Sequence, residues 1–272
     1  MSYKLMLHSG ANVATREQVM ATATPEPTET HYPVPHATMI ETVEKHIVAS
    51  GFTVDRQEYG LWNDGMRMFG VWCLGHPQHV EKDWRLAIGL RNAHDKAFSA
   101  SFGVGENVFV CDNMSFHAEI MVVRKHTRYV LRDLDGMIAE AAGKLGAARV
   151  TTAERIAAYK ATELTDVQVH DILVRSVDAR VIANAALPKV LKEWRTPTHE
   201  DFAPRTAWSL QNAYTEVMKA ANPQWVMRRT VNLTGMLDGF TGAFGVKAAT
   251  PDFGAGLERL GRIEQEEVPA DA

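Results

Sequence analysis

Residues 85–132 read RLAIGLRNAHDKAFSASFGVGENVFVCDNMSFHAEIMVVRKHTRYVLR, and this stretch decides the fold. Its apolar and β-branched runs are separated by turn signals at Asn92-Ala-His-Asp95, Gly103-Val-Gly105 and Asp112-Asn113. That pattern is typical of antiparallel strands joined by hairpins, here 85–91, 97–102, 107–111 and 116–124. Basic residues outnumber acidic ones within it, although the whole chain carries a net charge of −4. The segment therefore also gives the best lead to a function.

The residues on the N-terminal side extend the same pattern. Asn63-Asp64-Gly65 is a hairpin signal, and it predicts strands over 52–59 and 66–74. A capping box of Thr38 and Glu41 predicts a helix that ends at Gly51. Residues 1–35 are rich in proline and threonine and have little periodicity, so we expect an extended arm that docks on a neighbouring protomer.

On the C-terminal side the pattern becomes helical. Thr127 is expected to cap a helix that ends at Gly146, and capping boxes at Thr151 and Thr165 predict two more, the second running to about residue 186. A further helix is predicted over 206–221, followed by glycine-rich loops from 235. The fold class is therefore α+β, with an antiparallel β-meander packed against helices and a helical C-terminal half. The predicted organisation is an arm (1–35), a meander core (36–146), a helical region (147–245) and a glycine-rich, acidic tail (246–272).

Composition excludes several classes of protein. An apolar fraction of 46% and a charged fraction of 23% are ordinary for a globular protein. The sequence contains no signal-peptide pattern and no run of 18 apolar residues, so we expect a cytoplasmic protein that does not enter a membrane. Cys73 and Cys111 lie too far apart in the sequence for a zinc motif and are expected to be reduced thiols.

Catalytic and cofactor motifs are also missing. The sequence has no GxSxG elbow, no HExxH, no Walker A motif, and no dinucleotide fingerprint after Gly103-Val-Gly105. His76 and His79 have a plausible metal spacing, but neither a carboxylate nor a third histidine completes a site nearby. We therefore expect no catalytic residue, no metal ligand and no cofactor.

The basic residues of the central segment are the candidate nucleic-acid-binding residues. They lie in the turn after residue 90 and at the junction between a strand and a helix, where free backbone N–H groups favour an anion. Each also has an ordinary interpretation as a solvated surface charge. The predicted set is Arg91, Lys96, Arg124, Lys125, His126 and Arg128.

Aromatic residues offer stacking surfaces for bases, although at strand spacing most are expected to belong to the core. Those considered are Trp62, Trp72, Trp84, Phe98, Phe102 and Phe109.

Several short motifs, in this order, resemble one known family, the phage- and plasmid-borne domain of unknown function 932. They are Tyr32-x-Val34-Pro-His36, Asp64-Gly65, Asn92-Ala-His-Asp95, Val110-Cys111-Asp-Asn113, Arg124-Lys-His126-Thr127 and the helical run from Thr206 to Glu216. The resemblance covers most of residues 30–245 and departs from the family at 92–96, where the usual turn is small and polar. It implies a mobile-element origin in a bacterial host cell and supplies no activity.

Three functions remain open. The first is a single-stranded DNA- or RNA-binding or annealing protein that forms a homo-oligomer, because the order of helix, meander and helices is similar to that of single-strand annealing proteins. The second is a protein-interaction factor without catalysis, acting in counter-defence or host takeover. The third is a metal-dependent nuclease. Salt-dependent binding to short single strands separates the first two.

Overall fold

The computed structural model describes residues 12–77, 82–108, 114–219 and 223–242. These residues form one antiparallel sheet with the strand order β1-β2-β3-β4-β5-β6, so every strand pairs with its neighbours along the chain. The helices follow mainly after the sheet, which confirms the expected α+β class with a helical C-terminal half. No helix in these ranges is both long enough and apolar enough to span a membrane.

The strands are β1 (Asn12–Ala14), β2 (Thr53–Trp62), β3 (Arg67–Gly75), β4 (Trp84–Ala93), β5 (Ala100–Val108) and β6 (Met114–Arg124). The helices are α1 (Arg16–Met20), α2 (His36–Ala49), α3 (Val130–Gly143), α4 (Leu145–Ala161), α5 (Asp166–Asp178), α6 (Leu187–Arg195), α7 (Ala207–Met218) and α8 (Pro223–Thr241). Two short 3-10 turns, Asn184–Ala186 and Glu200–Phe202, precede α6 and α7.

The β2–β3 hairpin forms where the sequence predicts it. Asn63, Asp64 and Gly65 have φ angles of 53°, 53° and 80°, a left-handed conformation that Asn, Asp and Gly adopt most readily. Gly51, with φ of 84°, ends α2 as expected. The helix itself begins at His36, two residues before the expected cap.

The N-terminal segment is more structured than the expected arm. β1 pairs with β2, with Val13 opposite Gly60, and the capping box of Thr15 and Gln18 starts α1. Arg16 of α1 then bonds Glu44 of α2 at 2.5 Å and Gln57 of β2 at 2.8 Å. Residues 12–20 are therefore held by their own chain, whereas residues 1–11 lie outside the described part.

The hairpin predicted at Gly103-Val-Gly105 is wrong. β5 runs through these residues without turning back, and the pairing with β6 shifts register between Gly103 and Gly105. Glycine inside a strand commonly marks such a bulge, so the same residues that suggest a turn here permit an irregular strand. The chain reverses earlier, between β4 and β5, where Lys96 has φ of 68°.

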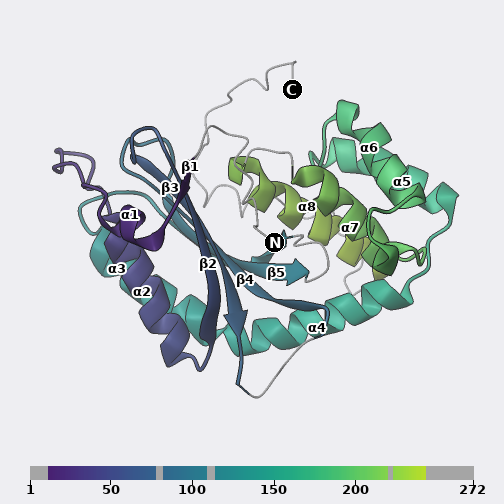
Figure 1. Ribbon diagram of the computed structural model, residues 1–272, viewed down its shortest axis with the longest axis horizontal. Coiled ribbons are helices and arrows are strands. Elements are labelled where there is room, and N and C mark those ends of the chain that lie inside the picture. Colours follow the sequence, from purple (N-terminus) through teal and green to yellow (C-terminus); the bar gives the residue numbers. More distant parts are fainter. Residues whose placement is uncertain (1–11, 78–81, 109–113, 220–222, 243–272) are drawn as a thin grey trace.

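Both faces of the sheet are buried. Ile88 and Val108 belong to the main core, which α2 and α3 cover, as Figure 1 shows on one side of the sheet. Val71 lies on the opposite face, because it pairs with Gly89 whereas Trp72 pairs with Ile88. There Val71 packs with Ala87 and with Val231 of α8. Val71, Ile88 and Val108 are all buried, but these side chains do not share one face.

The helical half differs from the prediction in its boundaries. α4 is continuous through Thr151, so the capping box predicted there is wrong, and neighbouring Thr152 is buried in the helix interior. Thr165 caps α5 as expected, and Thr206, where a helix was predicted to begin, caps α7. α5 ends at Asp178 rather than near 186, and α8 fills residues 223–241, where loops had been expected from 235.

Candidate nucleic-acid interface

Arg91 is at the centre of a small cluster on the sheet. Its Nε donates to Ser101 Oγ at 2.8 Å, across the β4–β5 pair, and its guanidinium carbon lies 5.3 Å from the centroid of the Phe98 ring. The Phe98 ring lies 5.9 Å from that of Trp62, tilted by 32°. We call Trp62, Arg91, Phe98 and Ser101 the arginine–aromatic cluster. It combines one cation with two partly exposed rings.

The charge of Arg91 is not neutralised within the described residues. Its contacts there are with Ser101 and Phe98, and neither is acidic. Removal from water disfavours the charged form, so burial lowers the pKa of the Arg91 guanidinium. A half-buried cation of this kind gains more from a nearby anion than a fully hydrated one does. The cluster is therefore a physically reasonable anion site.

The sheet face around Arg91 carries both small and large side chains, with Phe69 directly opposite Arg91 on β3. Neighbouring positions on the same face include Gly89 and Gly103, which present no side chain. Alternation along β3 places Arg67 on this face as well, and its Nε bonds Asp95 at 2.7 Å. We call this side of the sheet the arginine face, and it is the one against which Val231 packs.

A surface cavity of about 410 Å³ lies beside Trp62. Its walls come from β1, from the β2–β3 turn and from Gln18 of α1. Asn12, Asn63 and Asp64 give it polar groups, and its volume is within the range of small-molecule sites. The Trp62 ring thus borders both the cavity and the arginine–aromatic cluster.

The structure separates the predicted basic residues into two groups. Arg91 and Lys96 belong to the β4–β5 hairpin region, where Lys96 is exposed. Arg124 pairs with Ala100, the neighbour of Ser101, so Arg124 and Arg91 point to opposite faces of the sheet.

At the β6–α3 junction, Arg124 forms an ion pair with Asp133 at the start of α3. Lys125 is exposed, and the guanidinium carbon of Arg128 lies 5.8 Å from the Tyr129 ring centroid. These residues are not brought together with Arg91.

His126 lies inside the protein rather than on its surface. It belongs to a group that we call the histidine cluster, made of His31, His36, His94 and His126 with Asn92. The rings of His36 and His94 stack at 4.0 Å, and those of His31 and His126 lie 5.1 Å apart. All five side chains are 8% exposed or less.

Burial controls the protonation of the histidine cluster. It lowers the pKa of His36 to about 4, with a further contribution from neighbouring His94. The same cause lowers the pKa of His126 to about 4, helped by His31 and His94. Both rings are therefore neutral near pH 7. Sequence reasoning missed this cluster, although each member falls in or beside one of the motifs quoted above.

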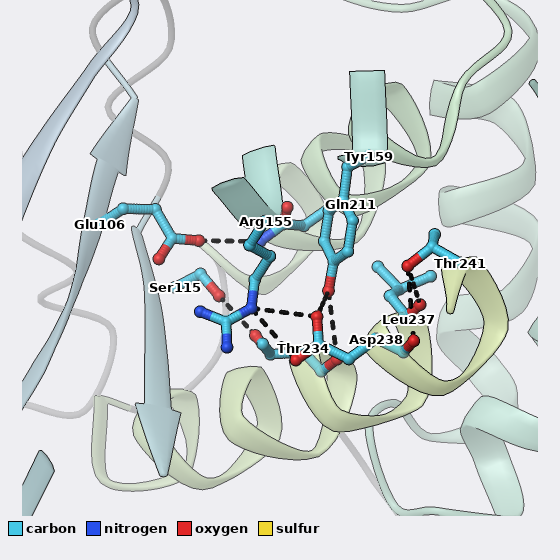
Figure 2. Close-up of polar contacts among 9 residues, drawn as sticks. All are labelled: Glu106, Ser115, Arg155, Tyr159, Gln211, Thr234, Leu237, Asp238 and Thr241. Carbon is cyan, nitrogen blue, oxygen red and sulfur yellow. Dashed lines mark hydrogen bonds and ion pairs between the residues drawn. The ribbon is translucent and has the colours of Figure 1, made fainter. Parts of the chain in front are cut away.

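A second group of buried polar residues joins the sheet to the helical half (Figure 2). Arg155 Nε donates to both carboxylate oxygens of Asp238, at 3.0 and 3.1 Å, and Tyr159 donates to Asp238 Oδ1 at 2.6 Å. Gln211 Nε2 donates to Glu106 Oε1 at 2.9 Å.

Ser115 Oγ lies 3.2 Å from Thr234 Oγ1 and completes the group, which we call the junction network. It draws on β5, β6, α4, α7 and α8.

The junction network has the features of a structural contact between the sheet and the helical half. Arg155 is 2% exposed and Glu106 1%, and burial together with Asp238 raises the pKa of Tyr159 well above its usual range. Buried charges are stable only when they are paired and hydrogen-bonded, which explains the density of contacts here. The residues come from positions up to 132 apart in the sequence (Glu106 to Asp238), so no local pattern reveals them.

Within 12–77, 82–108, 114–219 and 223–242, no group of three or more His, Cys, Asp and Glu is placed to hold a metal ion. Cys73 is buried and its Sγ donates to Asn107 Oδ1 at 3.6 Å, whereas Cys111, Phe109 and His79 lie outside these ranges. Trp72, Trp84 and Phe102 are core residues.

Comparison with known proteins gives a family but no relative of known activity. No curated protein and no solved structure matches the chain. A family model described as "Domain of unknown function (DUF932)" matches residues 27–238. The match spans the histidine cluster, the arginine–aromatic cluster and the junction network, and it agrees with the resemblance seen in the sequence motifs. The chain therefore belongs to the DUF932 family.

Proposed function

We propose that this protein binds single-stranded DNA or RNA through the arginine–aromatic cluster. The observation that carries the proposal is Arg91, a half-buried guanidinium that contacts no carboxylate among the described residues and lies against Phe98. The proposal includes an annealing role, which requires the bases of one strand to stay accessible. It also includes a homo-oligomer in the cytoplasm of a bacterial host and a mobile-element origin.

The chemistry of the cluster suits a single strand better than a duplex. Bases of a single strand can stack on Trp62 and Phe98, and each such stack is worth about 1–3 kcal/mol. A phosphate between two stacked bases would meet Arg91, with Lys96 adding charge from the hairpin. Gly89 and Gly103 on the same face present no side chain, whereas Phe69 lies directly opposite Arg91 on β3. Stacking and charge together favour nucleic acid over a simple anion.

The junction residues are a second, independent contact in this proposal. Lys125 and Arg128 are exposed there, while Arg124 already has Asp133 as an acidic partner. An arginine that already has an acidic partner gains less binding energy from a phosphate than an unpaired arginine does. Arg91 is therefore expected to contribute more to binding than Arg124.

Fluorescence anisotropy of a labelled single-stranded oligonucleotide tests the proposal. Binding by the full chain is expected at low salt and should weaken linearly in log–log form as salt rises. Arg91→Ala should weaken binding and reduce the salt slope by about 0.7, the value for one phosphate of a single strand. Trp62→Ala should weaken binding with an unchanged slope, because stacking releases no counterions.

Matched controls separate the site from general loss of charge or fold. Arg175→Ala removes an exposed arginine of α5 that pairs with Asp171, and this variant should bind as the unchanged protein does. Urea unfolding should confirm that each variant is folded. Absence of binding at low salt would overturn the proposal in favour of a protein-interaction role. Undiminished binding by Arg91→Ala, with a loss in Lys125→Ala, would move the site to the junction.

A further inference from the structure

Residues 31–36, HYPVPH, cross the sheet and are held by the histidine cluster. The backbone N–H of Tyr32 donates to His126 O at 2.9 Å, and that of Val34 donates to His126 Nδ1 at 3.2 Å. The Val34 carbonyl accepts from Asn92 Nδ2 at 2.7 Å and from His94 Nε2 at 2.9 Å. The polar groups of Val34 are thus bound entirely by cluster side chains.

The remaining bonds fix the segment at both ends. His31 Nε2 donates to the carbonyl of His94 at 2.9 Å. His36 Nε2 donates to the carbonyl of Gly65, in the β2–β3 turn, at 2.9 Å. His36 Nδ1 lies 2.9 Å from Asn92 Nδ2, whose hydrogen it accepts.

These contacts require neutral rings. Asn92 Nδ2 and the Val34 N–H are donors, so His36 Nδ1 and His126 Nδ1 must each offer a lone pair. A proton on either Nδ1 would set one donor against another and remove that bond. It would also place a positive charge next to further imidazoles in a space shielded from water.

The charged groups around the cluster offer little compensation for an added proton. Asp95, after β4, faces His94, and it is already bound by Arg67 and Asn63. Among the residues that the structure describes, the other titratable groups that act on the pKa values of His36, His94 and His126 are the cluster histidines themselves. A second positive charge therefore meets imidazoles rather than carboxylates.

We propose that the histidine cluster is an acid-sensitive latch, which holds residues 31–36 on the sheet at neutral pH and releases them when His36 and His126 gain protons. The latch lies at the N-terminus of α2, which begins at His36. It also anchors on the β2–β3 turn that forms one wall of the cavity beside Trp62. Opening the latch therefore removes support from both.

The pH window follows from the lowered pKa values. The released state binds protons with the ordinary histidine value of about 6.5, whereas His36 and His126 in the closed state titrate at about 4. The closed state is then fully favoured above about pH 6.5 and loses its advantage as pH falls toward 4. At pH 5, protonation favours release by about thirtyfold for each of the two histidines.

Hydrogen–deuterium exchange on the full chain tests the latch. The amides of Tyr32 and Val34 report its closure, since both bond to His126. After correction for the intrinsic effect of pH, their protection should fall at least about thirtyfold between pH 7 and pH 5. Amides inside α5 should keep their protection over the same range.

Variants then assign the effect to the two rings. His126→Asn keeps an acceptor near the Nδ1 position, and His36→Gln keeps a donor for Gly65, so the double variant should close the latch without pH dependence. His170→Gln, on the exposed side of α5, should behave like the unchanged protein. Equal protection of the unchanged protein at pH 7 and pH 5 would overturn the proposal, as would an undiminished pH effect in the double variant.

A measurement without substitution covers the case in which a variant does not fold. Imidazole ¹⁵N shifts of the unchanged protein should show neutral Nε2–H rings for His36 and His126 at pH 7. Their titration midpoints should lie well below 6.5 and coincide with loss of the Val34 amide bond. Midpoints near 6.5, with the Tyr32 and Val34 amides unmoved, would overturn the latch.

Discussion

Removing Asp238 is the sharpest test of the junction network. Its carboxylate accepts two bonds from Arg155 and one from Tyr159, and the side chains of Arg155 and Asp238 are only 2% and 13% exposed. Asp238→Ala leaves a buried guanidinium without this carboxylate and leaves Tyr159 with the Thr234 carbonyl, 3.2 Å away. Breaking a buried pair from one side costs about 3–5 kcal/mol of unfolding free energy.

Replacing both partners should cost much less. In Arg155→Met with Asp238→Leu, neither member of the pair is left as an unpaired charge, and apolar side chains fill a similar volume. We expect the double variant to be more stable than the sum of the single changes predicts, by about 2 kcal/mol or more. Urea unfolding, followed by tryptophan fluorescence, measures all four corners of this cycle.

The exposed pair of Arg175 and Asp171 on α5 is the matched control. Its nitrogen–oxygen distance is 2.8 Å, but both side chains are at least half exposed, so its removal should change stability by no more than about 0.5 kcal/mol. A loss below about 1 kcal/mol in Asp238→Ala, or additive effects in the double variant, would refute the reasoning for the junction network.

Three further changes have defined outcomes. Gly65→Ala should destabilise the protein by about 1 kcal/mol or more, because φ is 80° and the added carbon would lie 2.9 Å from Thr22; Gly51→Ala, with open space around it, tests the effect of φ alone. Thr165→Ala should cost about 1 kcal/mol by removing the cap of α5, and Thr165→Ser should restore it, both measured by thermal unfolding. The free energy of unfolding should fall by about 2 kcal/mol for each of His36 and His126 between pH 7 and pH 5, because these histidines bind protons at pH 5 in the unfolded chain but stay neutral in the folded one. A free energy of unfolding that does not change with pH in urea titrations would contradict this.

Some local signals predicted the local features correctly, and others misled. Asn63-Asp64-Gly65 gave the β2–β3 turn because its conformation is intrinsic to those residue types. Thr165 and Thr206 gave true helix starts for the same reason. Gly103-Val-Gly105 misled, since glycine permits both a turn and a strand irregularity, and only the partner strand decides between them. Thr151 misled because packing extended α4 through a residue that can also cap a helix.

The sites were less predictable than the fold. Arg91 was singled out from its local charge, and the structure adds the Phe98 and Trp62 rings around it. His126 was predicted as a surface contact, but its place in the interior depends on His31 and His94, which are distant in the sequence. Such clusters arise from tertiary contacts, so the periodicity and spacing of residues in the sequence do not predict them.

Helix α4 limits where the chain can be cut into separate fragments. Its first turn begins at Leu145, and along its length it contributes Arg155 and Tyr159 to the junction network before Lys160 reaches Asp83, just ahead of β4. A cut between residues 146 and 147 therefore falls within one turn of the helix that links sheet and helices. Fragments separated there should each expose charges that the intact chain keeps covered, and they should regain a fold only when mixed. Deletion studies that seek a minimal active piece have to keep α4 whole and attached on both sides.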